Sequence, residues 1–259
     1  MTSVARTIGE RLHTAGVRQV FGHPGGEVVD LIEGFRQAGL EFVLAKHETG
    51  AAFMAEAMAS STGRPGACLA TLGPGATNLV TGVAHAYLDR APVIALAGQL
   101  PVDRYELVTH QKLDLRALFA PITKWQARVT PATAAVVTDR ALRVALRPRQ
   151  GPVFLEVPSD VPAQEARDGA KDADPPSGVG AVDARSVAAA LTLLRNCARP
   201  VVLAGLDALD AATVAPLRGL AEAWGIPVIL SPKAKGLLRD DHPLYVGAIE
   251  GLGSAKLYE

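Results

Sequence analysis

Hydrophobic positions in the N-terminal half of the chain alternate between helical and strand spacing. Residues 3–15 place Val4, Ile8 and Leu12 four residues apart, which is typical of a helix with one buried face. Short continuous apolar runs follow, and Gly-rich turns separate them from further helical segments. The pattern predicts strands at 18–21, 42–45, 67–72 and 92–97, and helices at 28–35, 48–60 and 76–88.

The apolar strands between these helices predict the fold class. A short strand without an alternating polar face is buried on both sides, as in a parallel sheet that helices cover on both faces. Right-handed crossovers place the helices in this way. The alternation continues through 122–129, a helix at 131–146 and a strand at 153–157. We therefore expect an α/β fold with a parallel sheet and helices on both faces.

A change of composition divides the chain. Residues 162–180 are rich in Pro, Gly, Ala and charge and have no hydrophobic period, which is typical of an interdomain linker. We predict a first domain over 1–162, a linker over 163–182 and a second α/β domain over 183–259. The second contains predicted helices at 183–196 and 210–224 and strands at 200–204 and 226–230. Its length is short for an independent doubly wound fold, so we interpret it as partial.

Composition and charge exclude several classes of protein. Lys plus Arg and Asp plus Glu each total 26, and the zero net charge argues against a nucleic-acid binder or a polybasic membrane-surface protein. No run reaches the roughly 18 apolar residues of a membrane span. The two cysteines, Cys68 and Cys197, form no metal-type pair and no disulfide scaffold. We expect a cytoplasmic protein that acts on small molecules.

Three turn segments follow predicted strands, at the sheet edge where parallel α/β proteins bind ligands. They are Gly22 to Gly26, Lys46 to Ala52 and Gly73 to Asn78. Taken singly, each has an ordinary structural explanation. The first is a strand-to-helix turn, Glu48 suits the positive end of a helix dipole, and the third is an ordinary helix start, with anion binding as its functional alternative. The third segment lacks the P-loop lysine and the GxGxxG spacing.

In this order, the segments resemble the N-terminal, pyrimidine-binding domain of thiamine-diphosphate-dependent enzymes, in particular the acetolactate synthase group. The resemblance spans residues 5–162, in the stretches VFGHPGGEVVDL, HETGAAFMAEA, GPGATNLVTGVAHAYLDRAPVIALAGQLP, PITKW and GPVFLEVPSDVP. A fainter likeness to the family's central domain runs from Arg199 through IPVILSPKAKGLLRDDHPLYVGA.

The resemblance implies thiamine diphosphate as cofactor and Glu48 as the catalytic carboxyl group. In this family that carboxyl hydrogen-bonds N1′ of the aminopyrimidine and promotes the imino tautomer, which removes the proton from thiazolium C2. The resemblance also implies two groups of cofactor-binding residues. They are Pro24, Gly25 and Gly26 in a loop over the pyrimidine, and Gly73, Pro74 and Asn78 in a turn beside the cofactor at a dimer interface.

The substrate side departs from the family pattern. Gln111 occupies the position of a glutamine that faces the substrate in acetolactate synthase-like enzymes, but its neighbours are His110 and Lys112 instead of an aromatic and an acidic residue. This departure puts specificity for pyruvate in doubt. His110 is either a donor to an anionic substrate or a solvated loop histidine. His23 stands where many relatives have Tyr and is a second candidate substrate contact.

The family's diphosphate and magnesium motif, Gly-Asp-Gly followed by a distant Asn, is absent from the sequence. We therefore expect the Mg²⁺ ligands in a domain that this chain lacks, and no metal ligand within it. The central domain also lacks the Gly-rich turn of FAD-binding relatives, so the sequence does not support a flavin. The chain is then truncated, which we favour, or one subunit of a split enzyme, or a non-catalytic relative.

The main hypothesis is the N-terminal part of an enzyme that decarboxylates a 2-oxo acid and transfers the acyl unit. Its partners are a small 2-oxo acid and further copies in a homodimer or homotetramer, or a chain that carries the diphosphate domain. The alternatives are a subunit of a split decarboxylase, a non-catalytic binding module of the same fold, and an unrelated nucleotide-binding domain. The acyl donor and acceptor stay open.

Overall fold

The computed structural model describes residues 2–167 and 182–249. The chain divides into two units, Met1–Ser177 and Gly178–Glu259, which are described separately. Within the described residues, no helix combines the length and the apolar character needed to cross a membrane.

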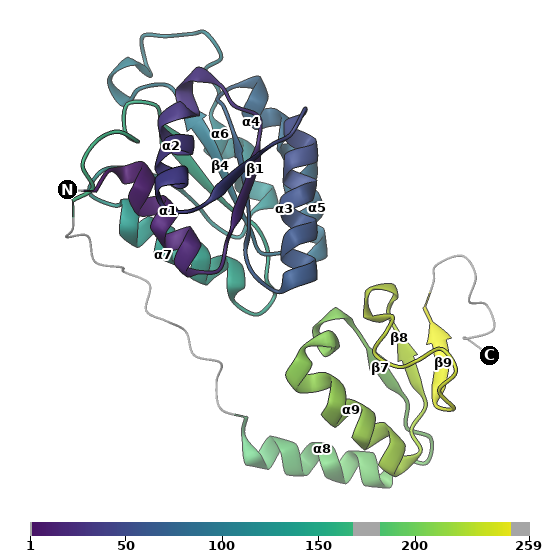
Figure 1. Ribbon diagram of the computed structural model, residues 1–259. Coiled ribbons are helices and arrows are strands. Elements are labelled where there is room, and N and C mark those ends of the chain that lie inside the picture. Colours follow the sequence, from purple (N-terminus) through teal and green to yellow (C-terminus); the bar gives the residue numbers. More distant parts are fainter. Residues whose placement is uncertain (1, 168–181, 250–259) are drawn as a thin grey trace. The chain divides into compact units, whose positions relative to one another are not determined.

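The first unit contains a six-stranded sheet whose strand pairs are all parallel, which confirms the predicted fold class (Figure 1). The strand order is β2-β1-β3-β4-β6-β5. The strands are β1 (Gln19–Gly22), β2 (Glu41–Leu44), β3 (Gly66–Ala70), β4 (Val93–Gln99), β5 (Gln126–Arg128) and β6 (Val153–Pro158).

Helices cover both faces of this sheet (Figure 1). The core on one face includes buried residues of α1 (Val4–Thr14), α2 (Val29–Gln37) and α7 (Ala134–Leu146). The opposite core includes buried residues of α3 (Glu48–Thr62), α4 (Pro74–Asn78), α5 (Val80–Asp89) and α6 (Leu115–Phe119). Short 3-10 helices are η1 (Gly26–Val28), η2 (Val102–Arg104) and η3 (Ala120–Ile122). Both cores are needed because β3, β4 and β6 are buried at every position.

Local sequence explains where several helices begin and end. Ser3 caps α1 by accepting a hydrogen bond from the Arg6 backbone N–H, and Val4, Ile8 and Leu12 are fully buried. His47 caps α3 in the same way, through Nδ1 and the backbone N–H of Thr49. Gly63 ends α3 in the left-handed conformation that favours glycine.

The helix predicted at 76–88 is instead two helices, α4 and α5. Pro74 is compatible with the first turn of α4 because a helix start needs no N–H at that position. The division follows Asn78, whose backbone oxygen accepts a hydrogen bond of 2.6 Å from the Thr49 hydroxyl. The sequence pattern also missed α6, and β5 is shorter than the predicted 122–129.

Residues 163–167, which the sequence analysis assigns to the linker, bond to the start of the first unit. The backbone N–H groups of Val4 and Ala166 donate to the oxygens of Gln164 and Thr2, respectively. Ser3 and Glu165 form an antiparallel bridge. Residues 168–181 of the predicted linker lie outside the described residues.

The second unit has a parallel sheet of three strands in the order β7-β8-β9. Its elements are α8 (Ala184–Asn196), β7 (Val202–Ala204), η4 (Leu206–Leu209), α9 (Ala211–Trp224), β8 (Val228–Leu230), η5 (Pro232–Ala234) and β9 (Tyr245–Ala248). Strand β9 was not predicted. The core includes Ala204, Ala221, Val228, Leu230, Ala234, Leu237 and Leu238.

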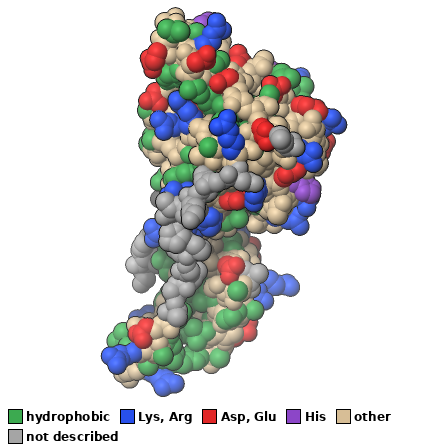
Figure 2. Space-filling view, turned by 90° about the vertical axis from the view of Figure 1, so that its left-hand side faces the viewer, with side chains coloured by type: hydrophobic (Ala, Val, Ile, Leu, Met, Phe, Trp, Pro, Cys, Tyr) green, Lys and Arg blue, Asp and Glu red, His purple; other side chains and the backbone are tan. Residues whose placement is uncertain are grey.

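Apolar side chains on the second unit are also exposed. Figure 2 shows apolar side chains on the surface of this unit. The exposed apolar residues of the unit include Val187 and Leu193 of α8 and Leu203 of β7. Helix α8 contributes no buried residue. The second unit therefore buries much less of its apolar surface than the first, in which long apolar strands are fully enclosed.

We expect the native chain to have one reactive thiol. Cys197 is exposed, whereas Cys68 lies inside β3, where burial raises the pKa of its thiol to about 12. Because the thiolate is the reactive form, Cys68 should stay unmodified at neutral pH until the chain unfolds. Titration with an aromatic disulfide reagent, before and after denaturation, measures the two thiols.

Two variants serve as controls for this titration. Cys197→Ser should remove the native signal and keep one thiol in the unfolded chain. Cys68→Ser should leave the native signal unchanged. Modification of Cys68 in the folded chain at the rate of Cys197 would contradict the expected burial.

Candidate functional site

The sheet topology brings the three turn segments together. Strands β2, β1 and β3 are neighbours, and the segments that follow them all leave from the carboxyl edge. The chain passes from β1 to β2 on one side, and β3 pairs on the other side of β1. This reversal of strand order is a topological switch point, where open α/β sheets form ligand crevices.

Glu48 is the first residue of α3, directly beyond the end of β2, and only 7% of it is exposed. Asn78 Nδ2 donates a hydrogen bond of 3.0 Å to Glu48 Oε2. Among the described residues, Glu48 Oε1 has no hydrogen-bond partner. A role limited to the helix dipole needs no burial, because first-turn acids act at the surface too. The carboxyl is therefore buried with one oxygen held and the other available.

Glycines near this carboxyl let the backbone pack closely without adding side-chain atoms. A Cβ on Gly75 would lie 3.2 Å from Glu48 Oε1 and 2.6 Å from Thr71 Cγ2. A Cβ on Gly25 would lie 2.6 Å from Thr71 Cβ. The backbones that follow β1 and β3 thus both approach Thr71. A flat ring can approach the carboxyl only where no side chain stands.

Two residues that the sequence analysis missed join these loops. The Thr71 hydroxyl donates a hydrogen bond of 2.6 Å to Glu27 Oε2, so the end of β3 is tied to η1. Thr71 lies inside the strand predicted at 67–72, and the structure places it directly after β3. Its signal was a single polar residue in that apolar run. Glu27 gave no signal of its own because an acidic residue in a first helical turn is common.

The structure places the remaining residues of the first turn at the surface. His23, Pro24 and Gly26 are exposed, and a Cβ on Gly26 would meet no atom within 4 Å. His23 Nδ1 lies 2.9 Å from the backbone oxygen of Ala45. Since a carbonyl only accepts, Nδ1 is the donor, and the loops after β1 and β2 are linked. Pro24 stays a predicted cofactor contact.

Gln111 lies against the turn that follows β3. A Cβ on Gly73 would be 2.7 Å from Gln111 Cβ and 3.0 Å from its backbone oxygen. Both residues have left-handed backbones, with φ of 56° at each. That conformation is ordinary for glycine but strained for glutamine, and such strain is concentrated at functional sites. The pair brings the predicted substrate residue Gln111 to the same edge as Gly73.

Pro74 and His110 have fewer contacts at this edge. Pro74 is exposed at the start of α4. His110 is exposed, and it makes no hydrogen bond or ion pair within the described residues. No hydrogen bond or ion pair of the described residues joins His110 to Glu48, and His110 stays a predicted substrate contact.

A buried polar network anchors the loop that carries Gln111. Gln99 Nε2 donates to the backbone oxygen of Leu113 at 3.0 Å and to Glu156 Oε2 at 3.2 Å. Arg128 Nε donates to Glu156 Oε1 at 2.5 Å. Gln99 and Glu156 are each 1% exposed. The sequence signal for this network was a single acidic residue inside the apolar strand predicted at 153–157.

The described residues do not place Glu48 in any cluster of His, Cys, Asp and Glu that is suited to a metal ion. The fit to thiamine diphosphate therefore rests on the carboxyl alone. A carboxyl with one bonded and one available oxygen, beside glycine backbones, suits a ring nitrogen that shares a proton.

Comparison with known protein families matches both units. Residues 2–118 match the model described as thiamine pyrophosphate enzyme, N-terminal TPP binding domain, where thiamine pyrophosphate is another name for thiamine diphosphate. Residues 187–259 match the central domain of the same enzymes.

The similarity to individual relatives extends over nearly all of the chain. An acetolactate synthase of Arthrospira platensis is 36% identical over an alignment of 260 positions, which covers 94% of this chain and 44% of the relative. A probable acetolactate synthase large subunit of Methanocaldococcus jannaschii is 36% identical over 258 residues, with coverage of 95% and 43%. Acetolactate synthase isozyme 1 large subunit of Escherichia coli is 34% identical over 242 residues, with coverage of 92% and 42%.

The chain thus spans less than half the length of these relatives. The two domain matches follow one another in the family's order, and the sequence similarity runs through both of them. This chain belongs to the thiamine-diphosphate-dependent enzyme family and is acetolactate synthase-like in sequence.

Proposed function

We propose that this chain supplies the pyrimidine side of a thiamine-diphosphate site in an enzyme that decarboxylates a 2-oxo acid and transfers the acyl unit, as in acetolactate synthesis. The observation that carries the proposal is the buried Glu48 carboxyl at the switch point, held by Asn78 through one oxygen only. The similarity to acetolactate synthases over both units supports the reaction class.

Bound thiamine diphosphate supplies the nucleophilic carbon and the electron sink for decarboxylation. The chain's own part is to hold and move one proton at Glu48 Oε1, while Asn78 fixes Oε2. Gly25 and Gly75 allow close approach of backbone, and Pro24, Gly26, Gly73 and Pro74 are further proposed cofactor contacts at the same edge. Burial of the carboxyl keeps water from competing for that proton.

The diphosphate side of the site is proposed to come from a domain with the Gly-Asp-Gly motif, which this sequence does not contain. That domain would hold Mg²⁺ and would belong to another copy in a homodimer or homotetramer, or to a partner chain. The relatives are more than twice as long as the region they share with this chain, which supports this division.

The substrate side is proposed to be the loop with Gln111. Its contact with Gly73 places it at the edge where Glu48 lies, and its side chain is exposed. His23 and His110 are further candidates for contact with the anionic 2-oxo acid. We also propose a cytoplasmic location, which the two unpaired cysteines support, since reducing compartments keep thiols free.

Glu48→Gln tests the proposed role of the carboxyl. Glutamine keeps an oxygen for the Asn78 bond but cannot release a proton, so the fold should survive. Activity should fall by about 100-fold or more, which is the usual contribution of a positioned acid-base group. The assay combines the chain with the diphosphate-binding domain, thiamine diphosphate, Mg²⁺ and pyruvate, and measures acetolactate and carbon dioxide.

Glu10→Gln is the matched control, because Glu10 is an exposed helical glutamate whose described ion pair is with Arg6. It should keep full activity. Near-normal turnover by the Glu48 variant would remove the proposed role of Glu48. Lack of activity in the unmodified assembly with every 2-oxo acid tried would remove the proposed reaction.

Gly73→Ala tests the contact between the β3 turn and the Gln111 loop. Alanine at this φ is strained, and its Cβ would also overlap Gln111. We expect the free energy of unfolding to fall by about 2–4 kcal/mol, from strain and overpacking together. Urea unfolding followed by Trp125 fluorescence, in a Trp224→Phe background, reports on the first unit.

Gly63→Ala separates the two causes. Gly63 has a φ of 67°, but a Cβ there would meet no atom within 4 Å. The free energy of unfolding of Gly63→Ala should therefore fall only by the cost of backbone strain, about 1–2 kcal/mol. An equal fall in the free energy of unfolding of Gly73→Ala and Gly63→Ala would show that the Gln111 loop does not constrain residue 73.

A further inference from the structure

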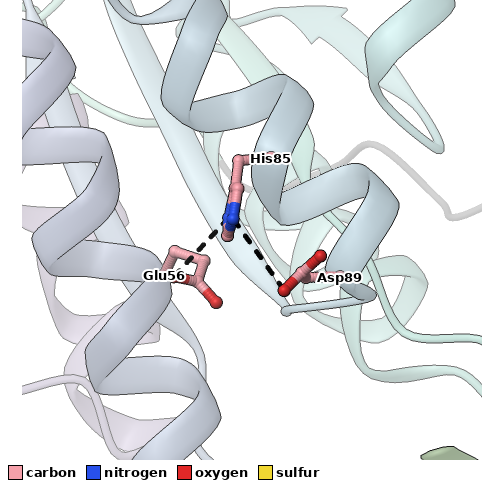
Figure 3. Close-up of side chains that lie close together, drawn as sticks. All are labelled: Glu56, His85 and Asp89. Atoms are coloured by element: carbon pink, nitrogen blue, oxygen red, sulfur yellow. Dashed lines mark ion pairs between the residues drawn. The ribbon is translucent and has the colours of Figure 1, made fainter. Parts of the chain in front are cut away.

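Helices α3 and α5 bring a histidine and two carboxylates together (Figure 3). His85 Nδ1 lies 3.8 Å from Glu56 Oε2, and His85 Nε2 lies 3.9 Å from Asp89 Oδ2. With one ligand atom taken from each residue, all three atoms lie within 4.8 Å of one another. His85 and Asp89 are one helical turn apart on α5, and Glu56 faces them from α3.

Neighbouring side chains hold two members of this cluster in place. The Ser60 hydroxyl donates a hydrogen bond of 2.9 Å to Glu56 Oε1, which leaves Oε2 directed at His85. The ring of Phe53 packs edge-on against His85, with centroids 5.2 Å apart and an angle of 64° between the planes. Metal-binding carboxylates and imidazoles are commonly oriented by such outer contacts.

We propose that Glu56, His85 and Asp89 bind a divalent transition-metal ion, with Zn²⁺ as the reference ion. One imidazole nitrogen and two carboxylate oxygens are a suitable ligand set for Zn²⁺, and water completes the coordination. Bonds of about 2.0–2.1 Å in tetrahedral geometry separate ligand atoms by about 3.4 Å. The observed separations therefore require small side-chain rotations, which the half-exposed His85 and the partly exposed Asp89 permit.

The chemistry of the ligands also predicts selectivity. Imidazole is a good ligand for Zn²⁺, Co²⁺ and Ni²⁺, whereas Mg²⁺ and Ca²⁺ prefer sites made of oxygen atoms alone. A single ion takes only one ring nitrogen, so the other nitrogen of His85 is left to one of the carboxylates or to water. This site is thus distinct from the Mg²⁺ that accompanies the proposed cofactor.

A bound ion would link the two helices that lead from Glu48 and Asn78. Glu56 is eight residues beyond Glu48 on α3, which is about 12 Å along a helix. Helix α5 begins two residues after Asn78. Cross-linking the helices at this distance stabilises their packing without placing the ion at the carboxyl edge. Binding to the folded state alone also raises the melting temperature.

Calorimetric titration of the untagged full chain with Zn²⁺, Co²⁺ and Mg²⁺ tests the proposal. We expect one Zn²⁺ per chain, a visible Co²⁺ absorption band typical of low coordination number, and no comparable binding of Mg²⁺. His85→Ala should weaken Zn²⁺ binding at least tenfold, because even outer contacts contribute 10–100-fold. Glu56→Gln and Asp89→Asn should also weaken it.

His242→Ala is the matched control. His242 Nε2 lies 3.1 Å from Glu222 Oε1 in the second unit, and this pair is not part of a three-residue cluster in the described chain. Its removal should leave the Zn²⁺ affinity unchanged. Circular dichroism of each variant establishes that it is folded.

Three results would overturn the proposal. They are no Zn²⁺ binding by the unmodified chain, equal affinity in the folded His85→Ala variant, and Mg²⁺ binding as tight as Zn²⁺ binding. Any of them would leave His85 as an ordinary ion-pair partner of the two carboxylates. A rise in the melting temperature of the unmodified chain with Zn²⁺, absent in the His85→Ala variant, would support the proposed metal site independently.

Discussion

The parallel pairing of β1 with β3 is the constraint on which the candidate site depends. Phe21 pairs with Cys68 and Gly22 with Leu69, so both strands end at nearly the same level. A Cβ on Gly22 would lie 2.4 Å from the Leu69 oxygen, so this approach requires glycine. Beyond this pair the chain diverges to α2 and to α4, on opposite faces of the sheet. Such a divergence at neighbouring strand ends is the arrangement at which open α/β sheets bind ligands.

Burial of Glu48 depends on two hydrogen bonds that run in opposite directions between α3 and α4. Thr49 donates to the Asn78 backbone oxygen, and Asn78 Nδ2 donates to the Glu48 carboxyl. Each helix therefore fixes the end of the other. A buried carboxyl without such a partner would be costly to keep in place. These two bonds require the ends of α3 and α4 to lie close together. Small residues in the two helices permit this approach, whereas bulkier side chains would separate the helix ends.

The sequence predicted those features that depend on local pattern. Apolar runs such as 92–97 predict buried strands, and Gly-rich turns after such runs predict the ligand edge. The three turn segments could be brought together because a parallel sheet collects carboxyl ends at one edge. Helix α6 and strand β9 were missed because each is short, and their structure comes from packing against distant residues. Thr71 and Glu27 are 44 residues apart, and no local pattern connects them.

The network of Gln99, Glu156 and Arg128 shows why the position of the loop with Gln111 was the hardest part to predict. A buried ion pair contributes little net stability, because desolvation of both groups offsets their attraction. What it provides here is position: Gln99 uses its amide nitrogen for Glu156 and for the Leu113 oxygen, and its amide oxygen for the Leu100 N–H. Leu113 is two residues beyond Gln111. The strained backbone of Gln111 is therefore held between this anchor and Gly73, by groups from β4, β5 and β6.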